Sequence, residues 1–170
     1  MQRARWFPDS RLNFAENLLR FRVTDASGKV IRHTMSRKQT WNIPTKGVNA
    51  IRVEYFYRAD VLALNQAKIT DDYAFFTGIQ LFMQPEGYRH LPSRLHFKMP
   101  QGWRLITPLK NTADPMTFIA DNYDTLVDAP AEMGKFDLKE FTVDDKPHYF
   151  VANPAGTFNA EKTEQFVEML

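Results

Sequence analysis

Short stretches of alternating apolar and polar residues recur along this 170-residue chain, and turn residues separate them. Clear examples are residues 19–23, 50–57 and 95–99. Alternation with a period of two places successive side chains on opposite faces of a strand, so each strand has one apolar face to bury. Strands at regular spacing with frequent turns are typical of two antiparallel sheets packed face to face. We therefore expect an all-β fold, a β-sandwich of antiparallel strands with a short C-terminal helix.

Turn residues suggest which of these strands form hairpins. Residues 24–29 contain Gly28, which tolerates positive φ, and they separate the strand at 19–23 from an expected partner at 30–33. A second hairpin is expected to pair residues 41–43 with 50–57, and a last one to pair 136–143 with 148–151. The apolar and aromatic residues 73–83 are expected to continue the β pattern.

Two segments favour helix instead. Residues 121–130 have two potential N-caps and end at a proline, which indicates a short helical turn on a loop. Residues 159–170 are expected to form a helix capped by Asn159, with Phe166, Met169 and Leu170 on one side. This helix has no C-cap in the sequence, so it is either the start of a following domain or a terminal helix docked on its own sheet.

Composition excludes several classes of function. Lys and Arg total 22 against 20 Asp and Glu, a balance too even for a nucleic-acid-binding surface, so we expect no nucleic-acid partner. No apolar run approaches the roughly 18–20 residues of a membrane span, and the N-terminus shows no signal-peptide core. We expect no membrane span, and the location stays open between cytoplasm and periplasm. The absence of cysteine excludes disulfides and thiolate chemistry.

The motifs of common enzymes are missing from the sequence. It contains no His-Glu-x-x-His, no Gly-x-Ser-x-Gly and no glycine-rich phosphate loop. His96 and His148, both on expected strands, could meet across a sheet as metal ligands, but unrelated surface histidines are the simpler interpretation. We assign no catalytic residue and no metal ligand, and expect that this chain alone is not an enzyme.

Aromatic residues are the one compositional excess, with 14 Phe, 6 Tyr and 3 Trp. Most of the Phe residues are expected in the core. Tyr73 and Tyr88 are divided between the core and a boundary with water, where a tyrosine hydroxyl finds partners. An exposed aromatic face would suit carbohydrate or peptide binding.

Several segments, taken in order, resemble the N-terminal domain of metallopeptidase family 61, the glycyl aminopeptidase family. The most diagnostic is Leu126-Val-Asp-Ala-Pro-Ala-Glu-Met-Gly134. The other matching segments lie at residues 14–17, 21–29, 38–43, 51–55, 78–83, 100–103 and 123–125. The resemblance spans roughly residues 14 to 151. At Trp6-Phe-Pro-Asp-Ser10 the chain departs from the Trp-x-Pro-Gly-Ser-Tyr of many members, and the strands that precede it in the family are missing, which leaves open whether the first sheet is complete.

The resemblance implies a domain order. Residues 1–155 would form the β-sandwich N-terminal domain, and residues 156–170 would start a catalytic domain that is not in this sequence. That domain would carry zinc on a His-Glu-x-x-His motif, where the metal polarises the scissile carbonyl and activates water. The partners implied are this protein's own catalytic domain and, indirectly, peptide substrates.

Within the resemblance, Asp128 and Glu132 are the candidates for the side of the substrate cleft, because a carboxylate there could meet a substrate amine. The simpler alternative is that both are loop carboxylates that cap backbone groups. The function we expect is a non-catalytic domain that packs on a zinc aminopeptidase domain and restricts access to its cleft. Two alternatives stay open: a stand-alone β-sandwich module that binds carbohydrate or peptide, and a scaffold or dimerisation domain.

Overall fold

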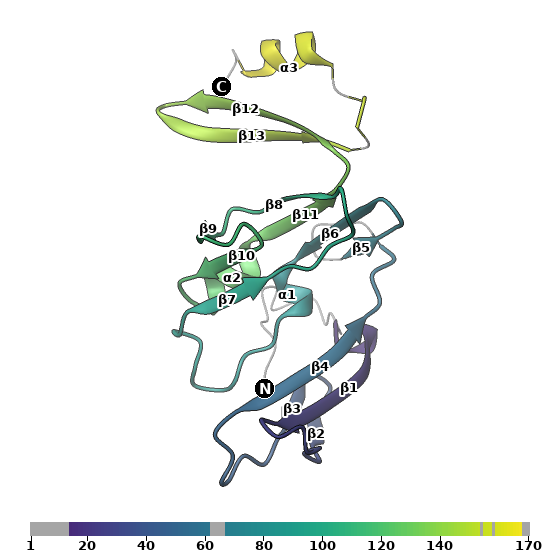
Figure 1. Cartoon of the computed structure of the whole chain (residues 1–170), viewed down its shortest axis with the longest axis vertical. Helices are drawn as coiled ribbons and strands as arrows, with labels where there is room; N and C mark the ends of the chain where they lie inside the picture. The colour runs from purple at the N-terminus through teal and green to yellow at the C-terminus, as the bar shows by residue number, and fades with distance from the viewer. Residues whose placement is uncertain (1–13, 62–66, 154, 158, 168–170) are drawn as a thin grey trace.

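The computed structural model describes residues 14–61, 67–153, 155–157 and 159–167. It is elongated and has three parts in chain order (Figure 1). Two-stranded ribbons lie at one end, two small sheets form the middle, and a hairpin with a helix lies at the other end. Most of the regular structure is antiparallel strand, which confirms the expected all-β class.

The N-terminal part contains a 3-10 turn at Phe14–Asn17, β1 (Leu18–Asp25), β2 (Thr34–Arg37), β3 (Thr40–Asn42) and β4 (Ile51–Tyr57). The middle contains β5 (Lys68–Ile69), β6 (Tyr73–Thr77), α1 (Gly78–Leu81), β7 (Ser93–His96), β8 (Arg104–Ile106), β9 (Lys110–Asn111), β10 (Thr117–Ala120), α2 (Tyr123–Asp128) and β11 (Pro130–Gly134). The C-terminal part contains β12 (Asp137–Val143), β13 (Lys146–Ala152) and α3 (Ala160–Val167).

The middle part is a small β-sandwich. One sheet has the strand order β5-β6-β11-β8 and the other β7-β10-β9. Alternation places Ala131 and Met133 of β11 against Phe118 and Ala120 of β10, and all four are buried in one apolar cluster. This cluster joins the two sheets, as the sequence pattern predicts.

Two short helices close one end of the sandwich. α1 packs against α2 so closely that a Cβ on Gly78 would lie 2.8 Å from Val127 Cα and would also strike the Leu126 carbonyl oxygen. α2 begins where expected, and the Asn122 side chain accepts a hydrogen bond from the Thr125 amide. The prediction of strand throughout residues 73–83 was wrong, because β6 ends at Thr77, where α1 begins at a glycine that allows this close approach.

The first two hairpins were predicted with the wrong partners. β1 pairs with β4, in a register that sets Val23 opposite Val53, and β2 pairs with β3. The chain does reverse at residues 25–29, where the Asp25 carboxylate accepts from the Ser27 and Lys29 amides. Beyond this turn the structure forms only an isolated bridge between Thr24 and Val30. β1 instead makes its much longer ladder of residue pairs with β4.

An aromatic stack fills the N-terminal part. The Phe21 ring stacks on Trp41 at 4.9 Å and lies edge-on to His33 at 4.8 Å, and Tyr55 continues the stack at 6.3 Å. The Tyr55 hydroxyl donates to the Leu81 carbonyl at 2.5 Å. The stack is thereby tied to α1 of the sandwich.

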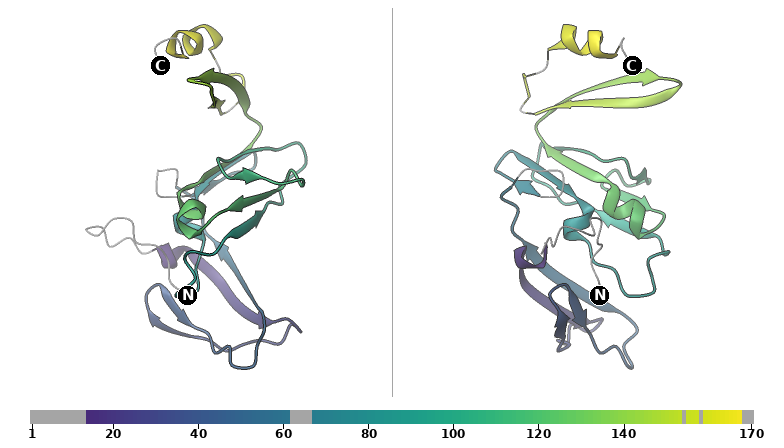
Figure 2. Two further views of the ribbon diagram at one scale, coloured as in Figure 1. Left: turned by 90° about the vertical axis from the view of Figure 1, so that its left-hand side faces the viewer. Right: turned by 180° about the vertical axis from the view of Figure 1, so that it is seen from behind.

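The last hairpin was predicted correctly. β12 pairs with β13 over seven residue pairs, and Asp144 and Asp145 both have positive φ at the tight turn. α3 follows with Asn159 as its N-cap, whose side chain accepts from the Lys162 amide at 3.0 Å. Met169 and Leu170 lie outside the described residues. Figure 2 shows that α3 lies on the side of the hairpin away from the sandwich.

Within the part of the chain that the structure describes, no helix is long and apolar enough to cross a membrane.

Candidate functional site: the outer face of the four-stranded sheet

Glu132 lies at the centre of a sheet rather than on a loop. It is the middle residue of β11, where its neighbours Ala131 and Met133 point into the core. Its own side chain therefore lies on the opposite face of the four-stranded sheet. In the ladder Glu132 pairs with Phe75 of β6 and with Ile106 of β8, and directly paired residues share a face.

We call this surface the outer face and define it by the side chains that the pairing places beside Glu132. The residues opposite Gly134 are Tyr73 on β6 and Arg104 on β8. The outer face comprises Lys68, Tyr73, Phe75, Arg104, Ile106 and Glu132. Gly134 has φ +147°, and a Cβ there would lie 2.6 Å from the Asp72 carbonyl oxygen. Glycine thus lets β11 lie close to the start of β6.

Burial changes the acid-base properties of the outer face. Partial burial raises the pKa of Glu132 above its usual value, and the hydrogen bond from the Asn153 side chain, 3.4 Å from Oε1, opposes this shift only in part. Burial also raises the pKa of Tyr73, with a further contribution from the negative charge of Glu132. A carboxylate with this shift is under-compensated, so a cation placed beside it gains more than it would from a fully hydrated carboxylate.

Arg104, which the pairing places on the outer face, contacts Phe136. Arg104 donates from Nη1 to the Phe136 carbonyl oxygen at 3.1 Å, and its guanidinium lies 5.3 Å from the centre of the Phe136 ring. Arg104 therefore fixes the point where the chain leaves the sandwich for the hairpin.

Asp128 has different surroundings. It is the last residue of α2 and is exposed. Two buried alanines, Ala129 and Ala131, lie between it and Glu132 in the sequence. Asp128 thus stands at the edge of the sandwich where α2 turns into β11, whereas Glu132 lies within the sheet.

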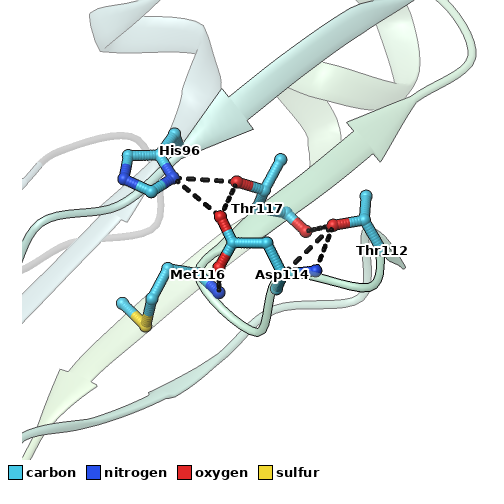
Figure 3. Close-up of polar contacts among 5 residues, drawn as sticks. All are labelled: His96, Thr112, Asp114, Met116 and Thr117. Atoms are coloured by element: carbon cyan, nitrogen blue, oxygen red, sulfur yellow. Dashed lines mark hydrogen bonds and ion pairs between the residues drawn. The ribbon is translucent and has the colours of Figure 1, made fainter.

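A polar cluster that the sequence did not reveal ties β7 to β10 (Figure 3). The Thr117 hydroxyl donates to Asp114 Oδ2 at 2.6 Å, and His96 Nδ1 lies 2.8 Å from the same hydroxyl oxygen. Asp114 also accepts from the Met116 amide at 3.0 Å, and these bonds, with that from Thr117 foremost, lower its pKa. Thr112 bonds to the backbone of the same turn through its hydroxyl.

The cluster has the residue types of a hydrolytic triad but not its arrangement. The single proton of the Thr117 hydroxyl points to Asp114, so His96 Nδ1 must be the donor to that oxygen. In a triad the histidine would instead take the proton from the hydroxyl. Thr117 is also buried, at 8% exposure. The cluster therefore stabilises the turn between β9 and β10.

The two histidines considered as a ligand pair lie in different sheets. His96 belongs to the cluster on β7, and His148 stacks on Phe141 within the β12–β13 hairpin. Among residues 14–61, 67–153, 155–157 and 159–167, no three His, Asp or Glu side chains gather as a metal site would require.

An apolar groove opens between the two sheets of the sandwich. Its volume is about 540 Å³, and most of its lining is apolar. Phe76, Phe97, Trp103 and Met133 contribute to its walls, and Asp71 and Lys98 lie on its lining as charged groups.

The aromatic residues divide only partly as expected, because few of the described Phe residues are fully buried. Phe97, Phe118 and Phe136 are buried in or beside the core. Tyr73 is half-buried and Tyr88 is 57% exposed, so both lie at boundaries with water. Phe56 and Phe166 are exposed, at 62% and 49%, and the Arg20 guanidinium lies over the Phe56 ring.

Comparison with known proteins gives a family and a similar fold. The chain is similar to the aminopeptidase N family protein from Idiomarina loihiensis, whose crystal structure superposes with a TM-score of 0.82 at 23% sequence identity. The match covers 99% of this chain and 30% of that chain, so this chain spans less than a third of its structural relative. No curated protein matches it significantly.

The sequence profile of the peptidase M61 N-terminal domain matches residues 5–135, more than three quarters of the chain. The matched region includes both sheets of the sandwich and the outer face, and it ends just before β12. The chain therefore belongs to the family of peptidase M61 N-terminal domains.

Proposed function

We propose that this chain is the non-catalytic N-terminal domain of a zinc aminopeptidase of the glycyl aminopeptidase type. In this proposal it packs on a catalytic domain in the same protein and shapes access to that domain's cleft, and the whole protein removes residues from peptide N-termini. The observation that carries the proposal is the family match over residues 5–135. The fold of the much longer aminopeptidase-family protein supports it.

Zinc, in this proposal, is bound by residues outside the described part of this chain. The described side chains do not fit the ion, because they bring no three potential ligands together. We therefore assign no zinc ligand here, and the roles proposed below belong to binding and packing.

Glu132 is the residue of this chain that we propose for contact with the substrate. Its carboxylate is half-buried on the outer face, with a raised pKa and one long hydrogen bond from Asn153. The ammonium group of a peptide N-terminus would compensate the buried charge. Asp128, exposed at the end of α2, is the second candidate for the rim of the cleft.

The test uses the full-length protein. We expect Glu132→Ala to raise KM for peptides with a free N-terminus by about ten-fold, the effect of losing roughly 1.4 kcal/mol of binding, with little change in kcat. Glu54→Ala is the matched control, because Glu54 is an exposed glutamate on β4, outside the outer face. Kinetic constants of Glu132→Ala that equal those of the parent for peptides of every length would exclude Glu132 from the cleft.

One observation favours the alternative of a peptide-binding module. The groove between the sheets is apolar and large enough, at about 540 Å³, to accept an apolar side chain. A peptide array and a glycan array probed with the 170-residue chain distinguish the two functions. The accessory-domain proposal predicts no useful affinity in either array, and specific binding would favour the module.

A further inference from the structure

We infer that the β12–β13 hairpin and α3 form a docking surface for the part of the protein that follows residue 170, so that this segment belongs structurally to the next domain. The inference rests on the proposed function, because it requires a longer protein. It places the boundary between domains before Asp137 rather than after residue 155.

The first reason is that the hairpin formed by β12 and β13 has no fully buried apolar side chain of its own. Among the residues whose side-chain burial the structure describes, every fully buried apolar side chain lies between Val23 and Phe136. Beyond Phe136, Thr163 is the only fully buried residue among those whose side-chain burial the structure describes. A two-stranded hairpin is at best marginally stable in water, and ordering a residue costs about 1–2 kcal/mol in backbone entropy alone. The segment therefore needs a further surface to pack against.

The second reason is that the segment exposes apolar side chains on both of its layers. Tyr149 of β13 is 50% exposed, and Phe166 of α3 is 49% exposed. On the hairpin, the pairing places Leu138 and Val151 on the same face as Tyr149. In the part of the chain described, β12 and β13 pair only with each other, which leaves both outer edges open.

The third reason is the way the segment joins the sandwich. Two hydrogen bonds hold the root of the segment, which is its junction with the sandwich. Arg104 donates to the Phe136 carbonyl oxygen, and the Asn153 side chain donates to Glu132. The Asp137 carboxylate also accepts from the Gly156 amide at 2.7 Å. Beyond this root the hairpin extends away from the two sheets (Figures 1 and 2). The hairpin is thus held in a set direction but is not packed on the sandwich.

The comparisons indicate which partner packs on this docking surface. The family profile ends at residue 135, before the hairpin, whereas the structural match covers 99% of this chain within a chain more than three times as long. The segment therefore keeps its fold in a protein that supplies additional chain. The remainder of this same protein is the partner to which we commit, rather than a second copy of the chain.

Hydrogen exchange measured by mass spectrometry tests the inference on two samples, the native full-length protein and the 170-residue chain. We expect amides of β12 and β13 to exchange at least about ten-fold more slowly in the full-length protein, while β10 and β11 are equally protected in both. Equal exchange of the hairpin in the two samples would overturn the inference. An intact mass showing that the native protein ends near Leu170 would instead remove the proposed function itself.

A pair of variants locates the surface. In the full-length protein, Tyr149→Ala is expected to speed exchange of the hairpin amides. Tyr88 is a similarly exposed tyrosine on the sandwich, and Tyr88→Ala is expected to leave this exchange unchanged. In the 170-residue chain neither variant should alter hairpin exchange. A Tyr149→Ala effect of the same size in both samples would show that Tyr149 acts within the hairpin and not at a domain interface.

Discussion

Glu132 and Asn153 meet where the sandwich joins the hairpin: the Asn153 side-chain amide lies 3.4 Å from Glu132 Oε1. Glu132 is in the central strand β11, and Asn153 directly follows β13. This contact links the outer face, proposed as the side of the cleft, to the segment proposed as the docking surface. A change at Glu132 should therefore affect both stability and function.

The first prediction concerns the pH dependence of stability. Because burial raises the pKa of Glu132, the folded chain binds more protons than the unfolded chain at pH values between the usual pKa and the raised one. Stability contributed by this group is therefore lost as the pH rises through that window. Glu132→Gln removes the ionisation, so we expect its Tm relative to the parent to increase as the pH rises from the usual pKa of glutamate through the raised one. Thermal unfolding at several pH values measures this, and a constant difference in Tm would contradict it.

The second prediction concerns Asp114, whose contribution to stability should depend on pH in the direction opposite to that of Glu132. The pKa of Asp114 is lowered, chiefly by the hydrogen bond from Thr117, so its contribution is present above the usual pKa and is lost as the pH falls through the lowered value. Asp114→Asn should thus destabilise the chain at neutral pH and lose this effect in acid. Asp71→Asn, at another exposed aspartate, is the control. Urea unfolding at neutral and acidic pH provides the comparison. If the destabilisation by Asp114→Asn grew in acid, the cluster of His96, Asp114 and Thr117 would not stabilise the turn as stated.

The third prediction concerns the close approach of α1 and α2. Gly78→Ala would place a methyl group 2.8 Å from Val127 Cα, so the helices must separate, at a cost of about 3 kcal/mol or more in the free energy of unfolding. Gly28→Ala is the matched control: it meets no atom within 4 Å but has φ +86°, so it should cost only about 1 kcal/mol. Chemical denaturation measures the free energy of unfolding of both variants. If both lost the same amount, α1 and α2 would be able to move apart without cost, which would contradict the prediction.

The fourth prediction concerns the aromatic stack of the N-terminal part. Phe21 contacts Trp41, His33 and Tyr55, so Phe21→Ala should cost about 2–4 kcal/mol and change the fluorescence of Trp41. Phe56→Ala removes a phenylalanine that is 62% exposed and should cost well under about 1 kcal/mol. Similar losses in both variants would mean that the stack does not support the fold.

The sequence predicted strands better than it predicted their partners. Alternation identified β1, β4 and the β12–β13 hairpin, and cap residues located α2 and α3. The partner of β1 was missed because a local turn signal at Asp25 and Gly28 competes with a distant strand, and only the tertiary fold decides between them. β10 and β11 escaped notice because they are short and contain small residues such as Ala120 and Ala131, which give a weak apolar pattern.

The candidate site was only partly accessible to the sequence. Glu132 was named from the family resemblance, but its place in a central strand and its burial depend on the neighbours that β6 and β8 bring to it. The cluster of His96, Asp114 and Thr117 has no sequence signal, since its members meet only through the pairing of β7 with β10. Whether Asp128 and Glu132 face substrate stays a prediction.

The central claim is that this chain is one domain of a larger zinc aminopeptidase. The most direct measurement is the intact mass and zinc content of the native gene product purified from its source. We predict a mass far above 19.8 kDa, with bound zinc and release of amino acids from peptide N-termini. A zinc-free native product of 19.8 kDa would contradict the claim, and the binding-module function would then be the better account.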